Sequence, residues 1–186
     1  SGPASLAALT ALKELSVTDC VISLQGLPAL TALERLELSQ GWGAPQGPRA
    51  AAASAPSAFA AVCGGGVVGA ALPHLTRLSH LSLAGSCCSE DAFRHIHHLG
   101  LLQELVLGWA ELPRPVVAGC EAWALPTTLD TTTMPGLSKL TRLQKLVVAG
   151  AVEVVDPALL QGLPASSLQH LQLEARVDVG EEDERR

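Results

Sequence analysis

The sequence has 186 residues, of which 48% are hydrophobic and 16% charged, and its net charge is −6. A chain of this length forms one domain or a run of small repeated units. Lysine and arginine dominate binding to phosphate backbones, so a mildly acidic chain without a basic stripe is expected to have no nucleic-acid partner. The sequence contains no asparagine, which excludes N-glycosylation.

A leucine frame recurs along the chain. It first appears as Leu12-x-x-Leu15-x-Val17, and the leucine at the Leu15 position serves as its anchor. The six anchors are residues 15, 36, 81, 105, 146 and 171, so they are separated by 21, 45, 24, 41 and 25 residues. A second leucine pattern precedes the frame, as in Leu27-Pro28-Ala29-Leu30-Thr31-Ala32-Leu33. Three of the intervals match the period of leucine-rich repeats, and the two long intervals each contain an insertion or a degenerate repeat.

The sequence therefore resembles the leucine-rich-repeat family. This resemblance implies an α/β leucine-rich-repeat solenoid of about six repeats with two insertions, parallel strands on its concave face and short helices or turns on its convex face. Both leucines of Leu-x-Leu point to one side of a strand, and neighbouring repeats must cover them. We expect the anchors to be among the least replaceable residues: Leu36, Leu81, Leu105, Leu146 and Leu171.

The segments between the strands carry helix signals. Ser89-Glu90-Asp91 is typical of a helix start, and Phe93, Ile96 and Leu99 form its inward stripe. Asp156-Pro157 indicates a second helix, with Leu159, Leu160 and Leu163 behind it. The segments around residues 24–30 and 137–140 predict tighter turns. The family usually has asparagine after each strand, where this chain has Cys20, Gly41, Ser86, Ala110, Ala151 and Arg176.

The predicted organisation alternates repeats and insertions. Repeats 1–2 span residues 1–42, repeats 3–4 span 72–112, and repeats 5–6 span 137–176. The first insertion, 43–71, is rich in Ala, Gly and Pro, and reads either as an inert loop or as a segment that docks on a partner. The second insertion is 113–136, and 177–186 is an acidic tail. Neither end has the pattern of a polar cap, which favours a larger parent protein or a covering partner.

The five cysteines have neither metal-ligand spacing nor an even number, so we expect reduced thiols in an intracellular, cytoplasmic protein. A cytoskeletal, ciliary or organellar assembly is an alternative location. Pro56 and Gly64–Gly66 interrupt the uncharged stretch 50–72, which argues against a membrane span. No motif for a catalytic residue or a cofactor occurs, so we expect no enzyme activity.

The residues between the inward leucines are the candidate partner-binding residues. They form a mixed polar rim around an apolar centre at Val106, Trp109 and Val147. Trp109 is interpreted either as an exposed binding hot spot or as a buried filler between repeats. The charged positions are interpreted either as a ladder of weak pairs, such as Glu14–Arg35 and Glu104–Lys145, or as part of the binding surface. The candidates are Arg35, Glu37, His80, Glu104, Val106, Trp109, Lys145, Val147 and His170.

His95, His97 and His98 raise the question of a metal site. His95 and His98 share a helix face, but no further ligand has a familiar spacing, so we expect solvent-facing histidines near a helix end and no bound metal. A regulatory metal or redox site at these histidines or at Cys87–Cys88 is the alternative.

These observations favour a non-catalytic protein–protein interaction module, as a scaffold or accessory subunit of a multi-subunit assembly. The alternative is a substrate-recognition adaptor of an enzyme complex such as a ubiquitin ligase, a role that leucine-rich repeats often serve.

Overall fold

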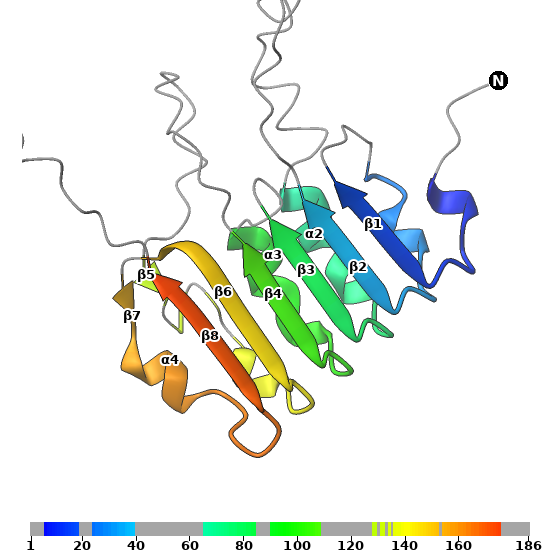
Figure 1. The fold of residues 1–186 in the computed structure, drawn as a ribbon. Coiled ribbons are helices and arrows are strands. Elements are labelled where there is room, and N and C mark those ends of the chain that lie inside the picture. Colours follow the sequence, from blue (N-terminus) through cyan, green and yellow to red (C-terminus); the bar gives the residue numbers. More distant parts are fainter. Residues whose placement is uncertain are drawn as a thin grey trace, which may run out of the picture.

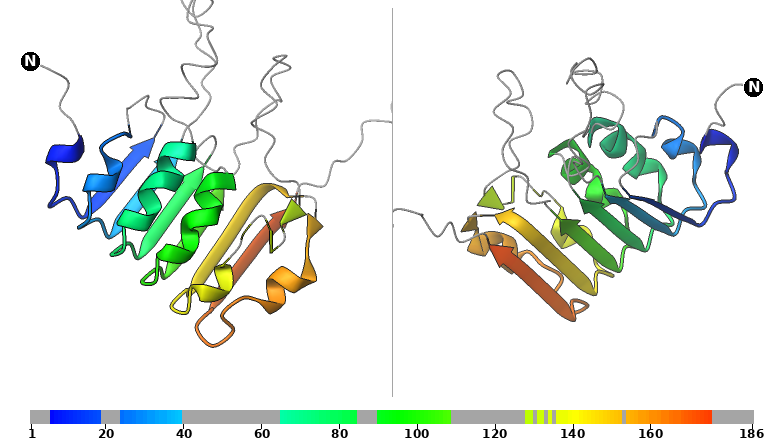
Figure 2. Two further views of the ribbon diagram at one scale, coloured as in Figure 1. Left: turned by 180° about the vertical axis from the view of Figure 1, so that it is seen from behind. Right: turned by 45° about the horizontal axis from the view of Figure 1, so that its top comes forward.

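The computed structural model describes residues 6–18, 24–39, 65–84, 90–108, 128–129, 131–132, 134, 136–152 and 154–175. Six strands form an all-parallel sheet in the order β1-β2-β3-β4-β6-β8, so each strand pairs with the next long strand along the chain. Helices cover one face of this sheet and leave the other open (Figures 1 and 2). This arrangement is compatible with the α/β repeat architecture expected from the sequence.

The strands and helices follow one another with short connections wherever the chain is described. The strands are β1 Glu14–Thr18, β2 Arg35–Ser39, β3 His80–Ala84, β4 Glu104–Gly108, β5 Thr128–Leu129, β6 Lys145–Val152, β7 Val154–Val155 and β8 His170–Ala175. The α-helices are α2 Gly65–Ala71, α3 Glu90–His95 and α4 Pro157–Gln161. The 3₁₀ helices are η1 Leu6–Ala8, η2 Leu27–Ala29, η4 Leu72–His74, η6 Ile96–His98 and η8 Leu137–Lys139.

The register of the sheet follows the leucine frame. The anchors are direct neighbours across the sheet, in the order Leu15, Leu36, Leu81, Leu105, Leu146 and Leu171. The sequence prediction that these six residues occupy equivalent positions is therefore confirmed. Because strand side chains alternate, one register places every Leu-x-Leu pair on the helix-covered side.

The core is built from these inward side chains. On β2, β3, β4 and β6 the two inward residues are at most 2% exposed. Among the residues whose burial is described, no polar or charged residue is buried. Apolar burial of this kind contributes on the order of 1.5–3 kcal/mol for each leucine, so the sheet depends on neighbouring strands for its stability.

The leucine triplets before the strands adopt 3₁₀ turns, as predicted for residues 24–30 and 137–140. In the first fully buried triplet, the Leu30 N–H donates to the Leu27 carbonyl at 3.0 Å and the Leu33 N–H donates to the Leu30 carbonyl at 3.0 Å. Side chains three residues apart eclipse each other in a 3₁₀ helix, so all three leucines point inward. All three are completely buried.

A repeated backbone contact fixes the start of each strand. The Gln144 carbonyl accepts two N–H groups of the following strand segment, from Gln169 at 2.8 Å and from His170 at 2.9 Å. The carbonyls of Lys13, Glu34, Ser79 and Gln103 each accept two N–H groups from the next segment in the same way. We call this series the carbonyl ladder.

The two predicted helix starts agree with the structure. Helix α3 begins at Glu90, and Phe93, Ile96 and Leu99 are at most 1% exposed. Asp156 caps α4, since its side chain accepts the Ala158 N–H at 2.8 Å. Of the three leucines that follow this helix start, Leu159 and Leu163 are at most 9% exposed, whereas Leu160 is 40% exposed.

The structure also differs from the predicted insertions. Residues 65–71, assigned to the first insertion, form helix α2, and its Val68 and Ala71 are completely buried in the core. In the second insertion, β5 pairs with β7, and Met134 is only 2% exposed. Alanine and glycine at 65–71 thus pack closely against the neighbouring helix instead of lengthening a loop. The remaining parts of both insertions lie outside the described residues.

The position after each strand is described only at Ala151. This residue lies inside β6, where the register against β8 is irregular around Gly150 and Ala151. The other five positions, where the family usually has asparagine, lie outside the described residues. Within the part of the chain that the structure describes, no helix is both long and apolar enough to cross a membrane.

The expectation that Leu171 is among the least replaceable residues is wrong. Leu171 is 42% exposed and Leu173 is 37% exposed, whereas Leu105 is completely buried. Among the residues that the structure describes, β8 has a neighbouring strand on one side only, whereas β4 lies between β3 and β6.

Replacing Leu105 by Ala should lower the free energy of unfolding by about 2–5 kcal/mol, because it leaves a cavity in a fully packed core. Leu171→Ala is the matched control, and its effect should be less than about half as large, since part of this side chain already contacts water. Chemical unfolding followed by circular dichroism measures both. Equal losses would contradict this account of the exposed last strand.

Gly136 has a φ of 92°, and a Cβ atom at this position would lie 2.6 Å from the His97 Cβ. Gly136→Ala should therefore cost at least about 1 kcal/mol through backbone strain and steric overlap. Gly100→Ala is the control, because nothing lies within 4 Å of its Cβ position. Thermal unfolding of both variants tests the difference, and equal stability of the two variants would contradict this account.

Candidate binding face

The outward side chains of the six strands form one continuous surface, which we call the open face. Three rows cross the sheet, because the parallel register places equivalent residues side by side. The first row is Glu14, Arg35, His80, Glu104, Lys145 and His170, and the second is Ser16, Glu37, Ser82, Val106, Val147 and Gln172. The third is Thr18, Ser39, Ala84, Gly108, Ala149 and Glu174.

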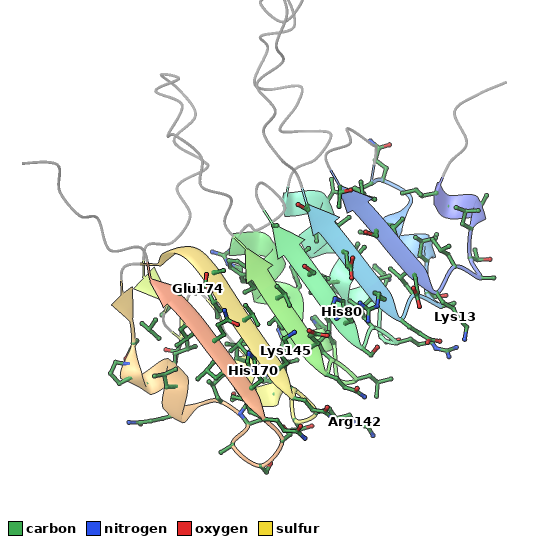
Figure 3. The ribbon with its side chains drawn as sticks, viewed as in Figure 1. Lys13, His80, Arg142, Lys145, His170 and Glu174 are labelled. Atoms are coloured by element: carbon green, nitrogen blue, oxygen red, sulfur yellow. The ribbon has the colours of Figure 1, made fainter. Side chains whose placement is uncertain are left out.

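Eight of the nine predicted binding residues are thus brought together on one face, and Figure 3 shows His80, Lys145 and His170 on three of its strands. The ninth, Trp109, lies outside the described residues, as do Trp42 and Trp123. The interpretations of Trp109 as an exposed anchor or a buried filler both stay predictions.

The charged side chains of the first two rows form a connected network. Arg35 Nη1 lies 3.0 Å from Glu37 Oε1, and the Ser16 hydroxyl donates to Glu37 Oε2 at 3.2 Å. On the other side, Lys145 Nζ donates to Glu104 Oε1 at 2.5 Å. The sequence predicted Glu104–Lys145 but paired Arg35 with Glu14. In the structure, the Arg35 guanidinium contacts Glu37, two residues along its own strand.

His80 joins the two halves of this network. Its Nδ1 lies 2.7 Å from Glu104 Oε2, and its Nε2 lies 3.4 Å from Glu37 Oε1. The His80 side chain is 11% exposed, less than either carboxylate. Only an imidazolium can donate from both ring nitrogens, so a neutral His80 donates to one carboxylate at a time. The imidazole therefore couples strands β2, β3 and β4 on the open face.

Both carboxylates of the network are held in their charged form. The hydrogen bond that Glu104 accepts from Lys145 lowers the pKa of Glu104, as does the one that it accepts from His80, and burial partly opposes both. The hydrogen bond from Arg35 lowers the pKa of Glu37, with smaller contributions from Ser16 and from the His80 charge. The network thus pairs its own charges and leaves little unbalanced charge for a partner to neutralise.

Small and apolar residues fill the part of the open face beside this network. Val106 on β4 is the direct neighbour of Val147 on β6, and both are partly exposed. The third row continues the patch with Gly108 and Ala149 on these two strands and with Ala84 on the adjacent β3. Because these side chains are small, an apolar group of a partner can approach the backbone of the sheet closely here.

His95 at the end of α3 and His97 and His98 in η6 cluster, but they do not have the arrangement of a metal centre. The His97 and His98 rings are 4.0 Å apart between centroids, and His95 stacks on His98 at 6.0 Å. Desolvation by neighbouring groups, with the charges of the other two histidines and Lys139, lowers the pKa of His98, although this side chain is exposed. Among the described residues, no group of three or more His, Cys, Asp or Glu side chains has an arrangement that could hold a metal ion.

The lowered pKa of His98 has a defined effect on stability. The folded state binds a proton at this position less readily than the unfolded chain does, so it loses stability as the pH falls below about 6.5.

Cys87 and Cys88, the alternative redox site, lie outside the described residues.

Four contacts of the network were missed by the sequence analysis: His80–Glu104, His80–Glu37, Arg35–Glu37 and Ser16–Glu37. The His80–Glu104 contact was within reach, because the anchors place these two residues side by side in the first row. The Arg35–Glu37 contact runs along one strand, and the choice between Glu14 and Glu37 as partner depends on side-chain rotamers that spacing does not specify. The Ser16–Glu37 contact depends on the same rotamer, because the Ser16 hydroxyl donates to the Glu37 carboxylate that Arg35 orients.

Comparison with known proteins adds no identification: no protein-family model matches the sequence, and the search of curated proteins found no match. The resemblance to leucine-rich repeats therefore depends on the repeated frame itself.

Replacing Lys145 by Met should raise the pKa of Glu104 toward its ordinary value of 4.5, because it removes the contact that lowers this pKa most. Carboxyl chemical shifts in an NMR pH titration measure the change. In the parent chain, the stability that Glu104 contributes is complete above pH 4.5 and is lost as the pH falls through its lowered folded-state pKa. Lys139→Met is the control, and an equal change in both variants would contradict this assignment.

Proposed function

We propose that this chain is a leucine-rich-repeat solenoid of about six repeats and a non-catalytic protein–protein interaction module. Its role is that of a scaffold or accessory subunit in a larger assembly. The proposal depends on the contrast between the two sides of the sheet: one is filled by stacked leucines, and the other presents outward residues that the fold does not need for its core.

The composition of the open face defines the chemistry of the partner. The charges of Arg35, Glu37, Glu104 and Lys145 are already paired within the chain. Favourable contact energy therefore comes mainly from the patch around Val106 and Val147, which favours an apolar segment over a highly charged one. Six strands about 4.8 Å apart span about 24 Å, which accommodates about seven residues of an extended segment crossing the strands.

The adaptor role named in the sequence analysis uses the same face but differs in its partners. A structural subunit stays bound in fixed stoichiometry through purification, whereas an adaptor exchanges its substrates and stays bound to the rest of its enzyme complex. Quantitative mass spectrometry of the purified native assembly separates the two roles.

Two of the three lysines of the chain, Lys145 and Lys139, allow a direct test of the open face. Lys145 lies on this face, with 43% of its side chain exposed, whereas Lys139 lies on η8 at the covered side. In the native assembly, acetylation of Lys145 should be at least several-fold slower than in the isolated chain, because the partner covers it. Acetylation of Lys139 should be unchanged. Mass spectrometry of the labelled chain measures both rates.

Val147→Glu should then weaken the complex by at least about tenfold, since it places an unpaired charge in the apolar patch. Thr76→Glu, at an exposed turn between η4 and β3, is the matched control for adding a charge elsewhere. Trp109→Ala is a second variant, and it tests the sequence-based interpretation of Trp109 as a binding hot spot. Retained affinity in Val147→Glu and Trp109→Ala, with Lys145 still reactive in the assembly, would overturn the proposal.

A further inference from the structure

At the two ends of the sheet, apolar side chains are exposed whose equivalents on the inner strands are buried. At the β8 end, Leu160 is 40% exposed, Leu171 is 42% exposed and Leu173 is 37% exposed. At the β1 end, Leu9 is 50% exposed, whereas its equivalents Leu30, Leu75, Leu99 and Leu140 are completely buried. Within the described chain, β1 and β8 are also the strands with a neighbour on one side only.

We propose that β1 of a second copy of this chain pairs in parallel with β8, so that copies associate head to tail. This pairing repeats the relation between every two neighbouring strands of the sheet. In the same register, Leu15 of the second copy lies beside Leu171, and Val17 of the second copy lies beside Leu173. The half-exposed leucines of β8 then gain the cover that Leu146 and Val148 already have.

The carbonyl ladder supplies the backbone contacts for this association. Each ladder carbonyl accepts two N–H groups from the following segment, and Gln169 occupies the next position after Gln144. In the head-to-tail pair, the Gln169 carbonyl accepts the N–H groups of Lys13 and Glu14 of the second copy. Unpaired backbone groups at a sheet edge are a known template for adding a strand, and here both edges have the required direction.

The charges in the first row favour the same register. His170 ends this row and Glu14 begins it, so the two side chains become neighbours in the head-to-tail pair. Inside the chain, the same combination occurs at His80 and Glu104, whose side chains lie 2.7 Å apart in equivalent neighbouring positions. The His170–Glu14 contact between copies thus has an internal precedent.

Head-to-tail pairing and β8–β8 pairing predict different assemblies. Pairing of unlike edges leaves one free edge at each end, so growth continues with concentration, whereas pairing of β8 with itself closes at a dimer. Sedimentation velocity of the full 186-residue chain distinguishes them. We expect the average mass to rise with concentration beyond that of a dimer. A monomer at every soluble concentration, or a mass that stops at the dimer, would overturn the proposal.

Two blocked variants make the test specific. Leu171→Lys with Leu173→Lys blocks the β8 end, and Leu9→Lys with Glu14→Lys blocks the β1 end. All four side chains are substantially exposed, so the fold tolerates the changes, and circular dichroism of each variant checks this. Each variant alone should be monomeric. A mixture of the two should form a 1:1 dimer and nothing larger, because one intact β8 edge meets one intact β1 edge.

Growth of either variant alone, or no dimer in the mixture while the parent chain associates, would overturn head-to-tail pairing. A charge exchange provides a measurement that does not depend on the leucines. Glu14→Lys and His170→Glu should each weaken association of the parent chain about two- to fivefold, and the chain carrying both should recover most of the loss. Additive losses in the doubly substituted chain would count against the proposed register.

Discussion

The structure depends on contact between leucines of neighbouring segments, because no segment can bury its own apolar side. A five-residue strand with two inward leucines leaves one flank of these side chains open on each side. Both flanks are covered only when a strand lies on either side of it. The exposures along the sheet follow this rule: Leu81 and Leu105 in the middle are completely buried, whereas Leu171 on the last strand is 42% exposed. Stability is therefore distributed along the sheet in nearest-neighbour contributions, and it is lowest at the two edges.

This dependence explains why much of the fold could be predicted from the sequence. The leucine frame specifies which residues face inward, and a parallel sheet with period-two alternation allows only one register that keeps them all inside. Asp156-Pro157 specified a helix start by a local capping interaction that needs no tertiary partner. Helix α2 was not predicted because three of its seven residues are glycine and two are valine, which have weak helix propensities. It forms where α3 and the neighbouring turns offer a surface on which small residues pack closely.

The candidate site was predictable as a set of positions but not as a set of interactions. Register places His80, Glu104 and Lys145 side by side, and this much follows from the anchor spacing. Which carboxylate binds Arg35 depends on side-chain rotamers, and the contact along β2 was preferred to the one across to β1. The edge residues were mispredicted for another reason: a repeated pattern describes each segment as though it had two neighbours, and Leu171 has only one.

The carbonyl ladder affects how the open face can change during evolution. Strand alignment is set at one end by main-chain bonds from residues 13, 34, 79, 103 and 144, and along the strand by inward leucines. The outward positions therefore contribute little to alignment, and we expect a substitution at Ser82 or Gln172 to leave the register intact. Recognition can thus diverge one position at a time on a framework that stays constant, so related chains with the same leucine frame need not share a partner.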